Sequence, residues 1–309
     1  MEIRLIDNLQ EKEQKKKLVY PNFIYNRQDI FCPLYDLFEI KEANKIFYIE
    51  VGYSSDTEAN MGIWLTPSSK DVFIKITDYV FKNHPDVQNI HFTYSFCEMG
   101  YSYNKNHYRI VLPATAEELH ARLSPKGRHN IKREKRLIEE QVGPCCVEEY
   151  RFPDIPPEII DLYFKMKQNT HGTQYAMKGE EYIKHYHVTN CYVLKAADKV
   201  LAILLSCEYS GMVVYLENLT YDTNYHKFSP GQVLYDWFLC KLIEKGFKEI
   251  FLAGGTTSYK KRYGGIEDTT YCGIIFRSWL KQIFYTFKQY IKHFVVKMRY
   301  MYINRKKGL

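Results

Sequence analysis

The 309-residue sequence lacks several features that would assign its class directly. It holds no apolar run of about 18 residues, so a transmembrane helix is not predicted. Its first residues, MEIRLIDNLQEKEQKKK, lack the apolar core of a signal peptide. The eight cysteines form no C-x-x-C pair and no ligand-like Cys/His repeat, which argues against a zinc site. We therefore expect no metal, reduced thiols and a cytoplasmic location.

Two common catalytic motifs are also missing. Without G-x-x-x-x-G-K-[ST], nucleotide hydrolysis by a P-loop is disfavoured, and without G-x-S-x-G the α/β-hydrolase reading fails. The net charge of +7 is compatible with anionic ligands but does not demand nucleic acid. A hydrophobic content of 46% is ordinary for a globular protein, and the length suggests about two domains.

Strands and helices alternate along the chain, which predicts a mixed α/β fold. The best-defined stretch is a meander of three antiparallel strands joined by tight turns, the second at Ser210-Gly211. A helix then leads to a short apolar strand, and such a crossover predicts a parallel strand pair. Strands are expected at 45–53, 62–65, 89–94, 108–112, 191–196, 200–209, 212–221 and 248–252, and helices at 71–82, 116–122, 125–142, 156–170 and 232–244.

The junction between the meander and its following helix is the strongest local feature. Ser229-Pro230-Gly231 opens the helix, and free backbone N–H groups at a helix start suit a pyrophosphate. His226 and Lys227 add positive or switchable charge beside it. Alternatively, the same residues are simply a good helix start.

A second candidate is the segment AGGTTSYKKRYGG, which leaves the last strand of the crossover at 253–265. Ligands of open α/β sheets bind outside the carboxyl ends of parallel strands. There, Tyr259 is a candidate acid and Lys260 a candidate for neutralising oxyanion charge. A basic surface loop is the alternative. The helix after Ser124 likewise reads either as a solvated face or as a cationic wall that includes Arg128 and Lys132.

Four motifs in this order carry a resemblance to a known family. They are the segment Leu123-Ser-Pro-Lys-Gly-Arg128 to Arg136, the helix start Ser229-Pro-Gly231, the Gly254-Gly255 pair and Tyr259-Lys260. The pattern resembles the GNAT-superfamily acyltransferases of the CelD-like and FemAB-like type over about 106–275. The resemblance implies a GNAT-like fold with two GNAT-like halves, divided as a degenerate half at 1–105, the acyltransferase domain at 106–275 and a C-terminal helix at 276–309.

The resemblance also assigns roles. The 225–234 junction corresponds to the acyl-donor pyrophosphate loop, with acetyl-CoA or another acyl-CoA as co-substrate held by Lys227, Ser229, Gly231, Gln232 and Val233. GNAT chemistry is direct attack of an amine or hydroxyl on a thioester, which needs orientation and proton removal. Glu217 is the first candidate for general base and His226 the second, with Tyr259 as acid and Lys260 beside it. The candidate substrate-binding residues are Arg128, Lys132, Asn218 and Asp222.

Three functions remain open. The first is transfer from acyl-CoA to an amine or hydroxyl of a cell-envelope sugar or polysaccharide precursor. The second is FemAB-like transfer from aminoacyl-tRNA to a peptidoglycan precursor, for which the basic stretches supply an electrostatic argument. The third is a non-catalytic scaffold at a membrane, supported by Ile250-Phe251-Leu252 at a place where CelD-like members often carry an Asp.

The final segment has its own character. Residues 269–309 contain no acid and nine Lys or Arg, and apolar residues from Phe276 to Met298 follow helical spacing. Such a basic amphipathic helix at 277–309 either docks on the protein body or lies on the anionic inner face of a membrane. The second alternative would suit a lipid-linked saccharide acceptor.

Overall fold

The computed structural model describes residues 1–16, 35–42, 45–62, 69–105, 107–171, 179–185, 188–209, 213–252 and 258–307. The chain divides into two compact units, one made of 1–105 with 270–309 and the other of 106–269. The second unit is therefore one continuous segment inserted into the first. This division differs from the predicted one after residue 269, because the last strand and the last helix belong with the first unit.

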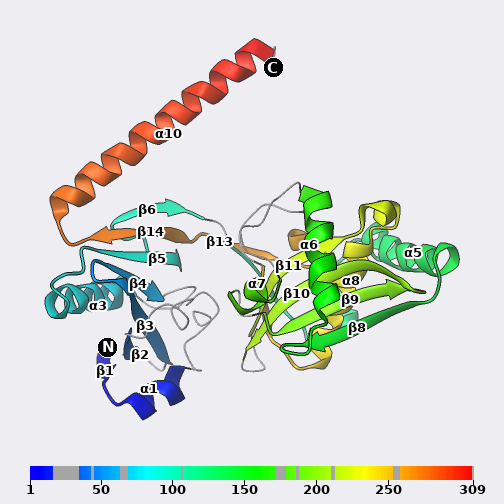
Figure 1. Cartoon of the computed structure of the whole chain (residues 1–309), viewed down its shortest axis with the longest axis horizontal. Coiled ribbons are helices and arrows are strands. Elements are labelled where there is room, and N and C mark those ends of the chain that lie inside the picture. The colour runs from blue at the N-terminus through cyan, green and yellow to red at the C-terminus, as the bar shows by residue number, and fades with distance from the viewer. Residues whose placement is uncertain are drawn as a thin grey trace. The chain divides into compact units, whose positions relative to one another are not determined.

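The first unit is built on a seven-stranded mixed sheet of order β1-β2-β3-β4-β5-β14-β6 (Figure 1). One helix, α3, crosses from β4 to its parallel neighbour β5 and buries Phe73 and Ile76 against the sheet. The strands are β1 (Glu2–Ile6), β2 (Tyr35–Glu42), β3 (Lys45–Ser55), β4 (Glu58–Gly62), β5 (Asn89–Ser95), β6 (Tyr101–Asn104) and β14 (Tyr271–Phe276), and the helices are α1 (Leu9–Lys16), α3 (Lys70–Asn83) and α10 (Trp279–Lys307).

The second unit has a seven-stranded mixed sheet of order β13-β7-β12-β11-β10-β9-β8. The predicted meander is β9, β10 and β11, and the predicted parallel pair is β11 with β12. The strands are β7 (His107–Val111), β8 (Cys145–Arg151), β9 (Asn190–Ala196), β10 (Lys199–Tyr209), β11 (Val213–Tyr221), β12 (Glu249–Phe251) and β13 (Ile266–Asp268), and the helices are α4 (Ala116–Ala121), α5 (Pro125–Gln141), α6 (Pro157–His171), α7 (Gly179–His185), the 3-10 helix η2 (Thr223–Phe228), α8 (Pro230–Glu244) and α9 (Ser258–Arg262).

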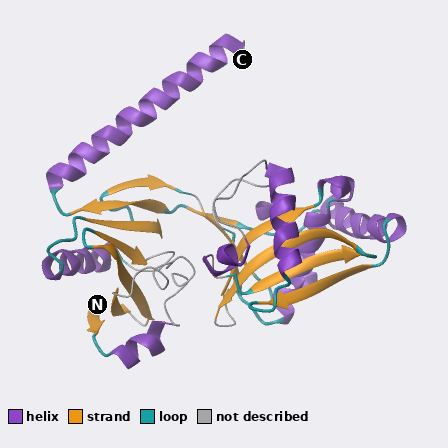
Figure 2. Cartoon of the chain, viewed as in Figure 1, coloured by secondary structure: helices purple, strands orange, loops and turns teal. Residues whose placement is uncertain are grey.

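Helices cover both faces of this second sheet, as Figure 2 shows. Along β9, Tyr192 and Leu194 pack in one cluster with residues of α4, α5 and α8, whereas Cys191 and Val193 pack in another with α6 and α7. This alternation follows from the period of two along a strand, and continuous apolar runs are expected where both faces are buried. The predicted mixed α/β class is thus confirmed.

Local signals set several helix boundaries as expected. Thr115 caps α4 by accepting a hydrogen bond from the Glu118 backbone N–H at 3.2 Å, and Ser124 caps α5 by accepting from the Gly127 N–H at 3.1 Å. Gly246 follows α8 with a φ of 81°, as a C′ glycine does. The predicted turn at Ser210-Gly211 and most of the strand predicted at 62–65 lie outside the described residues.

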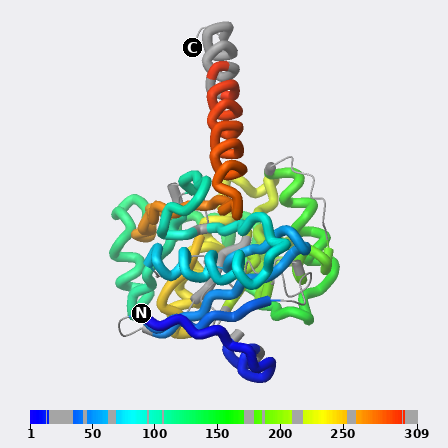
Figure 3. Tube along the Cα trace, turned by 90° about the vertical axis from the view of Figure 1, so that its left-hand side faces the viewer, coloured from blue at the N-terminus to red at the C-terminus, as the bar shows by residue number. Residues whose placement is uncertain are grey.

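The helix α10 begins on the first unit and then leaves it (Figures 1 and 3). Near its start, Tyr285 contacts the rings of Tyr101 and Phe276 at 5.2 and 5.0 Å between centroids. Beyond this point its large apolar side chains are exposed, among them Phe287 at 64% and Phe294 at 65%. No helix in the described part of the chain is long and apolar enough to span a membrane.

Candidate functional site

The pairing of β11 with β12 stops part-way along β11, in the middle of the second sheet. They pair in parallel from Val213 opposite Glu249 to Tyr215 opposite Phe251, where β12 ends, while β11 runs on to Tyr221 beside β10. Glu217 lies on this continuing part of β11, just past the last pair; its side chain is outside the described residues. Ligands of open α/β sheets bind outside the carboxyl ends of parallel strands, and β12 ends beside this part of β11.

Lys260 follows β12 on the short helix α9. Its side chain is only 3% exposed, and its Nζ lies 5.4 Å from the centre of the Tyr108 ring on β7. Burial lowers the pKa of Lys260 to about 8, because the charged ammonium loses its hydration. Near neutral pH this amine therefore exchanges its proton far more readily than a surface lysine does. The neighbouring side chain of Tyr259 and the predicted Gly254-Gly255 turn are outside the described residues.

The junction before α8 has an unusual backbone. Ser229 adopts a left-handed conformation with φ of 49°, and α8 starts at Pro230, which has no N–H to donate. Gly231 and Val233 are buried, and a Cβ on Gly231 would meet Tyr221 at an ordinary 3.5 Å. The first turn of α8 is thus packed into the unit.

Exposed positive groups precede this junction. The His226 ring bonds through Nδ1 to the Thr223 carbonyl at 2.9 Å. The Nζ of Lys227 donates to Gln141 Oε1 at 3.4 Å and stands 4.6 Å from the Phe228 ring centre. Both side chains are exposed on η2, at the end of the helix where its carbonyls favour cations.

A buried carboxylate faces the same junction from another helix. Glu134 of α5 is 8% exposed, and its Oε2 has no hydrogen-bond partner among the described residues. Burial raises the pKa of Glu134, while Ser229 and the charges of Arg133 and Arg262 oppose the rise. At the same place Arg262 donates to the side-chain oxygen of Gln232 in the first turn of α8. Glu134 was not predicted, because nothing in its local sequence distinguishes it from the solvated charges of α5.

The predicted substrate-binding residues fall into two places. Asn218 and Asp222 are at the far end of β11, where Asn218 Oδ1 accepts from the Leu219 N–H and Asp222 Oδ1 from the Asn224 N–H, both at 2.9 Å. Arg128 and Lys132 line a cavity among α4, α5 and α8 instead. The guanidinium of Arg128 is already hydrogen-bonded there, because its Nη1 donates to the Leu123 carbonyl at 2.7 Å.

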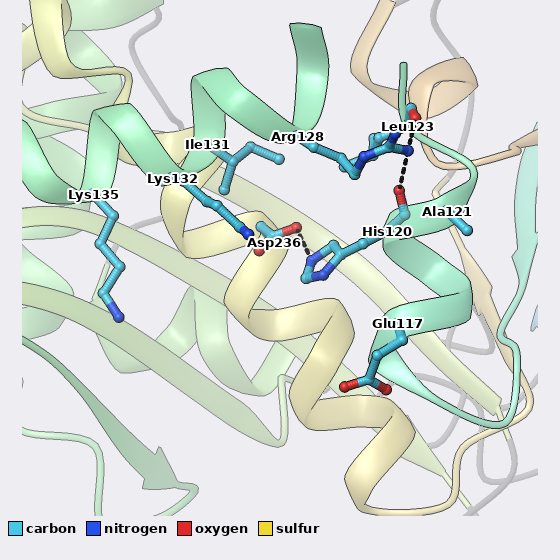
Figure 4. A pocket seen from close by; sticks show the side chains of 9 residues that line it. All are labelled: Glu117, His120, Ala121, Leu123, Arg128, Ile131, Lys132, Lys135 and Asp236. Carbon is cyan, nitrogen blue, oxygen red and sulfur yellow. Dashed lines mark hydrogen bonds and ion pairs between the residues drawn. The ribbon is translucent and has the colours of Figure 1, made fainter. Parts of the chain in front are cut away.

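That cavity has a volume of about 580 Å³ and contains residues that the sequence analysis missed (Figure 4). His120 of α4 contacts Asp236 of α8, with 2.9 Å between Nε2 and Oδ1. Tyr263 donates its hydroxyl to the same Oδ1 at 2.8 Å, and the Sγ of Cys240 lies 3.7 Å from the same Nε2. Burial raises the pKa of the Cys240 thiol to about 12. The only sequence signal was the i, i+4 spacing of Asp236 and Cys240, which places both on one helix face.

Comparisons with known proteins bear on this unit directly. Residues 125–261 match the family model described as an acetyltransferase (GNAT) domain. The second unit is therefore similar to GNAT-type acyltransferase domains over these residues. No curated protein sequence matches the chain.

Solved structures agree with this assignment of the fold. The crystal structure of FemX matches with a TM-score of 0.62 at 10% identity, over 88% of this chain and 97% of that one. L-PGS from Bacillus licheniformis matches with a TM-score of 0.51 at 11% identity, over 77% and 84%. Identities this low show the fold alone. The likeness to FemX nevertheless covers both units, so the two-unit plan itself is shared.

Proposed function

We propose that the protein transfers an acyl group to an amine or hydroxyl. We place the reaction in the second unit, where β11 continues past the end of β12. The observation that carries this proposal is the buried amine of Lys260, which follows β12 and has its pKa lowered to about 8. Together with the GNAT-type domain, it supports an enzyme rather than a scaffold. Functional groups with perturbed pKa values concentrate at active sites.

In the proposed reaction, the acceptor nitrogen or oxygen bonds to the acyl carbon and the donor bond to that carbon breaks. The acceptor loses a proton and the leaving thiolate or alkoxide gains one. Neutral Lys260 can take a proton, and its ammonium form can stabilise negative charge on the carbonyl oxygen. Glu217 and His226 stay the candidate general bases, and Tyr259 the candidate acid.

Acyl-CoA is the first candidate donor, held at the junction by Lys227, Ser229, Gly231, Gln232 and Val233. The exposed Lys227 supports this, since it offers a charge to a pyrophosphate. Glu134 favours the second candidate, aminoacyl-tRNA, because a buried carboxylate beside Ser229 opposes a pyrophosphate at the start of α8. FemX and L-PGS have the same fold, which is compatible with either donor.

Calorimetric titration with acetyl-CoA and desulfo-CoA separates the donors. If acyl-CoA binds at the junction, Glu134→Gln should bind more tightly than the unmodified chain, because a like charge is removed, and Lys227→Ala more weakly. Glu139→Gln, an exposed carboxylate on the same helix, is the matched control. No binding of either ligand to any variant would remove acyl-CoA, and salt-dependent binding of charged tRNA would then be measured.

For the acceptor we propose a cell-envelope sugar or polysaccharide precursor. Release of free thiol from acetyl-CoA in the presence of amino sugars and hydroxyl sugars tests this class. A Lys260→Met variant that turns over as fast as the unmodified chain would remove Lys260 from the reaction. An unmodified chain that releases no thiol with any acceptor would instead support a role in which the GNAT-type fold is kept without catalysis.

We further propose that α10 holds the protein at the anionic inner face of a membrane. Its exposed apolar side chains include Phe284, Phe287 and Phe294, while Lys281, Lys288 and Lys292 fall together on one edge of the helix at its 100° repeat. The 269–309 segment has no acid to oppose an anionic surface. An apolar face bordered by lysines is typical of helices that lie in the interface plane.

Co-sedimentation of the full chain with vesicles tests this placement. Binding is expected to vesicles that contain phosphatidylglycerol and to weaken with salt, since about 1 kcal/mol per basic residue comes from the surface charge. A Phe287→Gln, Phe294→Gln double variant should lose binding, and Gln289→Ala, on the other side of the helix, should keep it. Equal sedimentation of all three proteins would count against the proposal.

A further inference from the structure

Three metal-ligating side chains meet at the edge of the cavity among α4, α5 and α8, which His120 and Asp236 line. The ring nitrogen Nε2 of His120, a carboxylate oxygen of Asp236 and the Sγ of Cys240 all lie within 4.8 Å of one another. Asp236 and Cys240 come from one face of α8, and His120 approaches them from α4. The mechanism proposed above uses none of these three residues, so their arrangement needs its own explanation.

The arrangement differs from a nucleophile relay. In such a relay the histidine contacts the nucleophile through one ring nitrogen and the orienting carboxylate through the other. Here, Asp236 at 2.9 Å and Cys240 at 3.7 Å both face the same Nε2 of His120. Three ligand atoms that lie this close together are instead what a metal ion requires.

The distances fit a tetrahedral ion. Zinc bonds of 2.0–2.2 Å to nitrogen and oxygen and about 2.3 Å to sulfur put the ligand atoms roughly 3.3–3.5 Å apart. The separations of 2.9 Å from His120 to Asp236 and 3.7 Å from His120 to Cys240 bracket that range, and the donor atoms of Asp236 and Cys240 lie within 4.8 Å of each other. We propose that His120, Asp236 and Cys240 bind a divalent transition metal of the zinc class, with a fourth position open to the cavity.

Charge and the surrounding contacts support this site. A divalent ion bound by one carboxylate and one thiolate is neutral overall, so Lys132 and Lys135, which line the same cavity, do not repel the completed site. The hydroxyl of Tyr263 donates to Asp236 Oδ1 at 2.8 Å and so orients this carboxylate, as outer partners of metal ligands commonly do. The cavity itself gives the ion an entry path from solvent. On binding, the Cys240 thiol releases its proton to solvent.

Titration of the chelator-treated full chain with Co²⁺ is the direct test. We expect one equivalent to bind, with visible ligand-field bands of tetrahedral cobalt and a near-ultraviolet thiolate charge-transfer band, both displaced by Zn²⁺. Cys240→Ser should abolish the thiolate band, and His120→Gln should weaken binding. Tyr263→Phe should weaken it by about 10–100-fold.

Cys146→Ser is the matched control, because this thiol is exposed on β8 and is not one of the three ligands. It should retain the full cobalt spectrum. Absence of a thiolate band in the unmodified chain, or a band that survives Cys240→Ser, would overturn the proposal. Because the readout is spectroscopic, neither result depends on acyl transfer. Circular dichroism of each variant separates loss of metal from loss of fold.

Discussion

Each unit contains one crossover that joins two parallel strands through a helix, and the two differ in how far the strands stay paired. In the first unit, β4 and β5 pair from Glu58 opposite Asn89 to Met61 opposite Phe92, which leaves only the last residue of β4 beyond the pairing. In the second, the pairing of β11 and β12 stops at Tyr215, and β11 continues to Tyr221. The longer strand runs past the last pair in both units, to Ser95 of β5 in the first and to Tyr221 of β11 in the second, and this unpaired length is greater in the second.

The two crossover helices also differ in the negative charge at their first turns. α3 carries Asp71 in its own first turn, which complements the positive end of the helix. α8 has no acid in its first turn, and the nearby carboxylate of Glu134 comes from α5. Negative charge that comes from a second helix can be removed without changing α8, which makes the second junction the one that is open to experiment.

In each unit, a histidine and a tyrosine also contact the same aspartate. In the first unit, His84 Nε2 lies 2.9 Å from Asp36 Oδ2, to which Tyr53 donates at 2.5 Å. Within the described residues, no third metal-ligating side chain joins that pair. The thiol of Cys240 is what distinguishes the second cluster, so we expect metal to bind the second unit alone.

The largest expected effect is on catalysis. Lys260→Met should reduce acyl transfer by about 10²–10⁴-fold, the usual contribution of a positioned acid or base. Its neighbour Lys261 pairs with Glu267 at 3.4 Å and is exposed, so Lys261→Met is the matched control and should retain activity. Initial rates of thiol release measure both. Equal losses in the two variants would show that α9 needs charge rather than the buried amine.

Only part of the difference between the two crossovers could be predicted from the sequence. Apolar periodicity and Gly246 located β9 to β12 and α8, because these signals are local. The length over which two parallel strands pair depends on tertiary packing, so the residue at which the pairing of β11 and β12 stops could not be predicted from local signals. β8 was missed because Glu148 and Glu149 interrupt any strand-like alternation.

The candidate site shows the same limit. Lys260 was identified from its place after the last strand of the crossover and from a family resemblance, but its burial follows from the packing of α9 on β7. His120 and Asp236 are 116 residues apart, and no spacing rule connects residues at that distance. The return of β14 and α10 to the first unit likewise depends on long-range strand pairing with β5.

A second consequence of burying Lys260 concerns stability. Its pKa is lowered from 10.5 to about 8, so between these pH values the unfolded chain binds more protons than the folded one. The free energy of unfolding should therefore rise with pH across this window, by up to roughly 3 kcal/mol. Lys260→Met should be more stable than the unmodified chain below pH 8 and lose this advantage towards pH 10.5. Urea unfolding at pH 7, 9 and 10.5 measures it, and parallel curves for the two proteins would contradict the burial.

Alanine substitutions at two glycines, one in each unit, test which unit the transfer reaction depends on. A Cβ on Gly273 of β14 would lie 2.2 Å from the Tyr101 carbonyl oxygen, and one on Gly265 would lie 2.2 Å from the Lys260 carbonyl oxygen. Each Ala substitution should cost about 1–3 kcal/mol. Gly265→Ala should also impair transfer, because it displaces the backbone of Lys260, whereas Gly273→Ala should leave transfer intact.

Gly231→Ala is the control for stability alone, because its added methyl meets Tyr221 at an ordinary 3.5 Å. Thermal unfolding of the three variants, with thiol-release rates of Gly265→Ala and Gly273→Ala, distinguishes the effects. If Gly273→Ala impaired transfer as much as Gly265→Ala, the chemistry would depend on the first unit as well.

The smallest expected effect compares the serines that precede a helix in each unit. Ser124 accepts a hydrogen bond from the Gly127 N–H at 3.1 Å and so satisfies one free donor of α5. Ser69 precedes α3 with a similar extended backbone but makes no side-chain cap. Ser124→Ala should therefore cost about 1 kcal/mol, whereas Ser69→Ala should cost only a few tenths. Urea midpoints measure both, and equal costs would mean that the hydroxyl of Ser124 adds nothing to α5, the helix that carries Glu134 to the second junction.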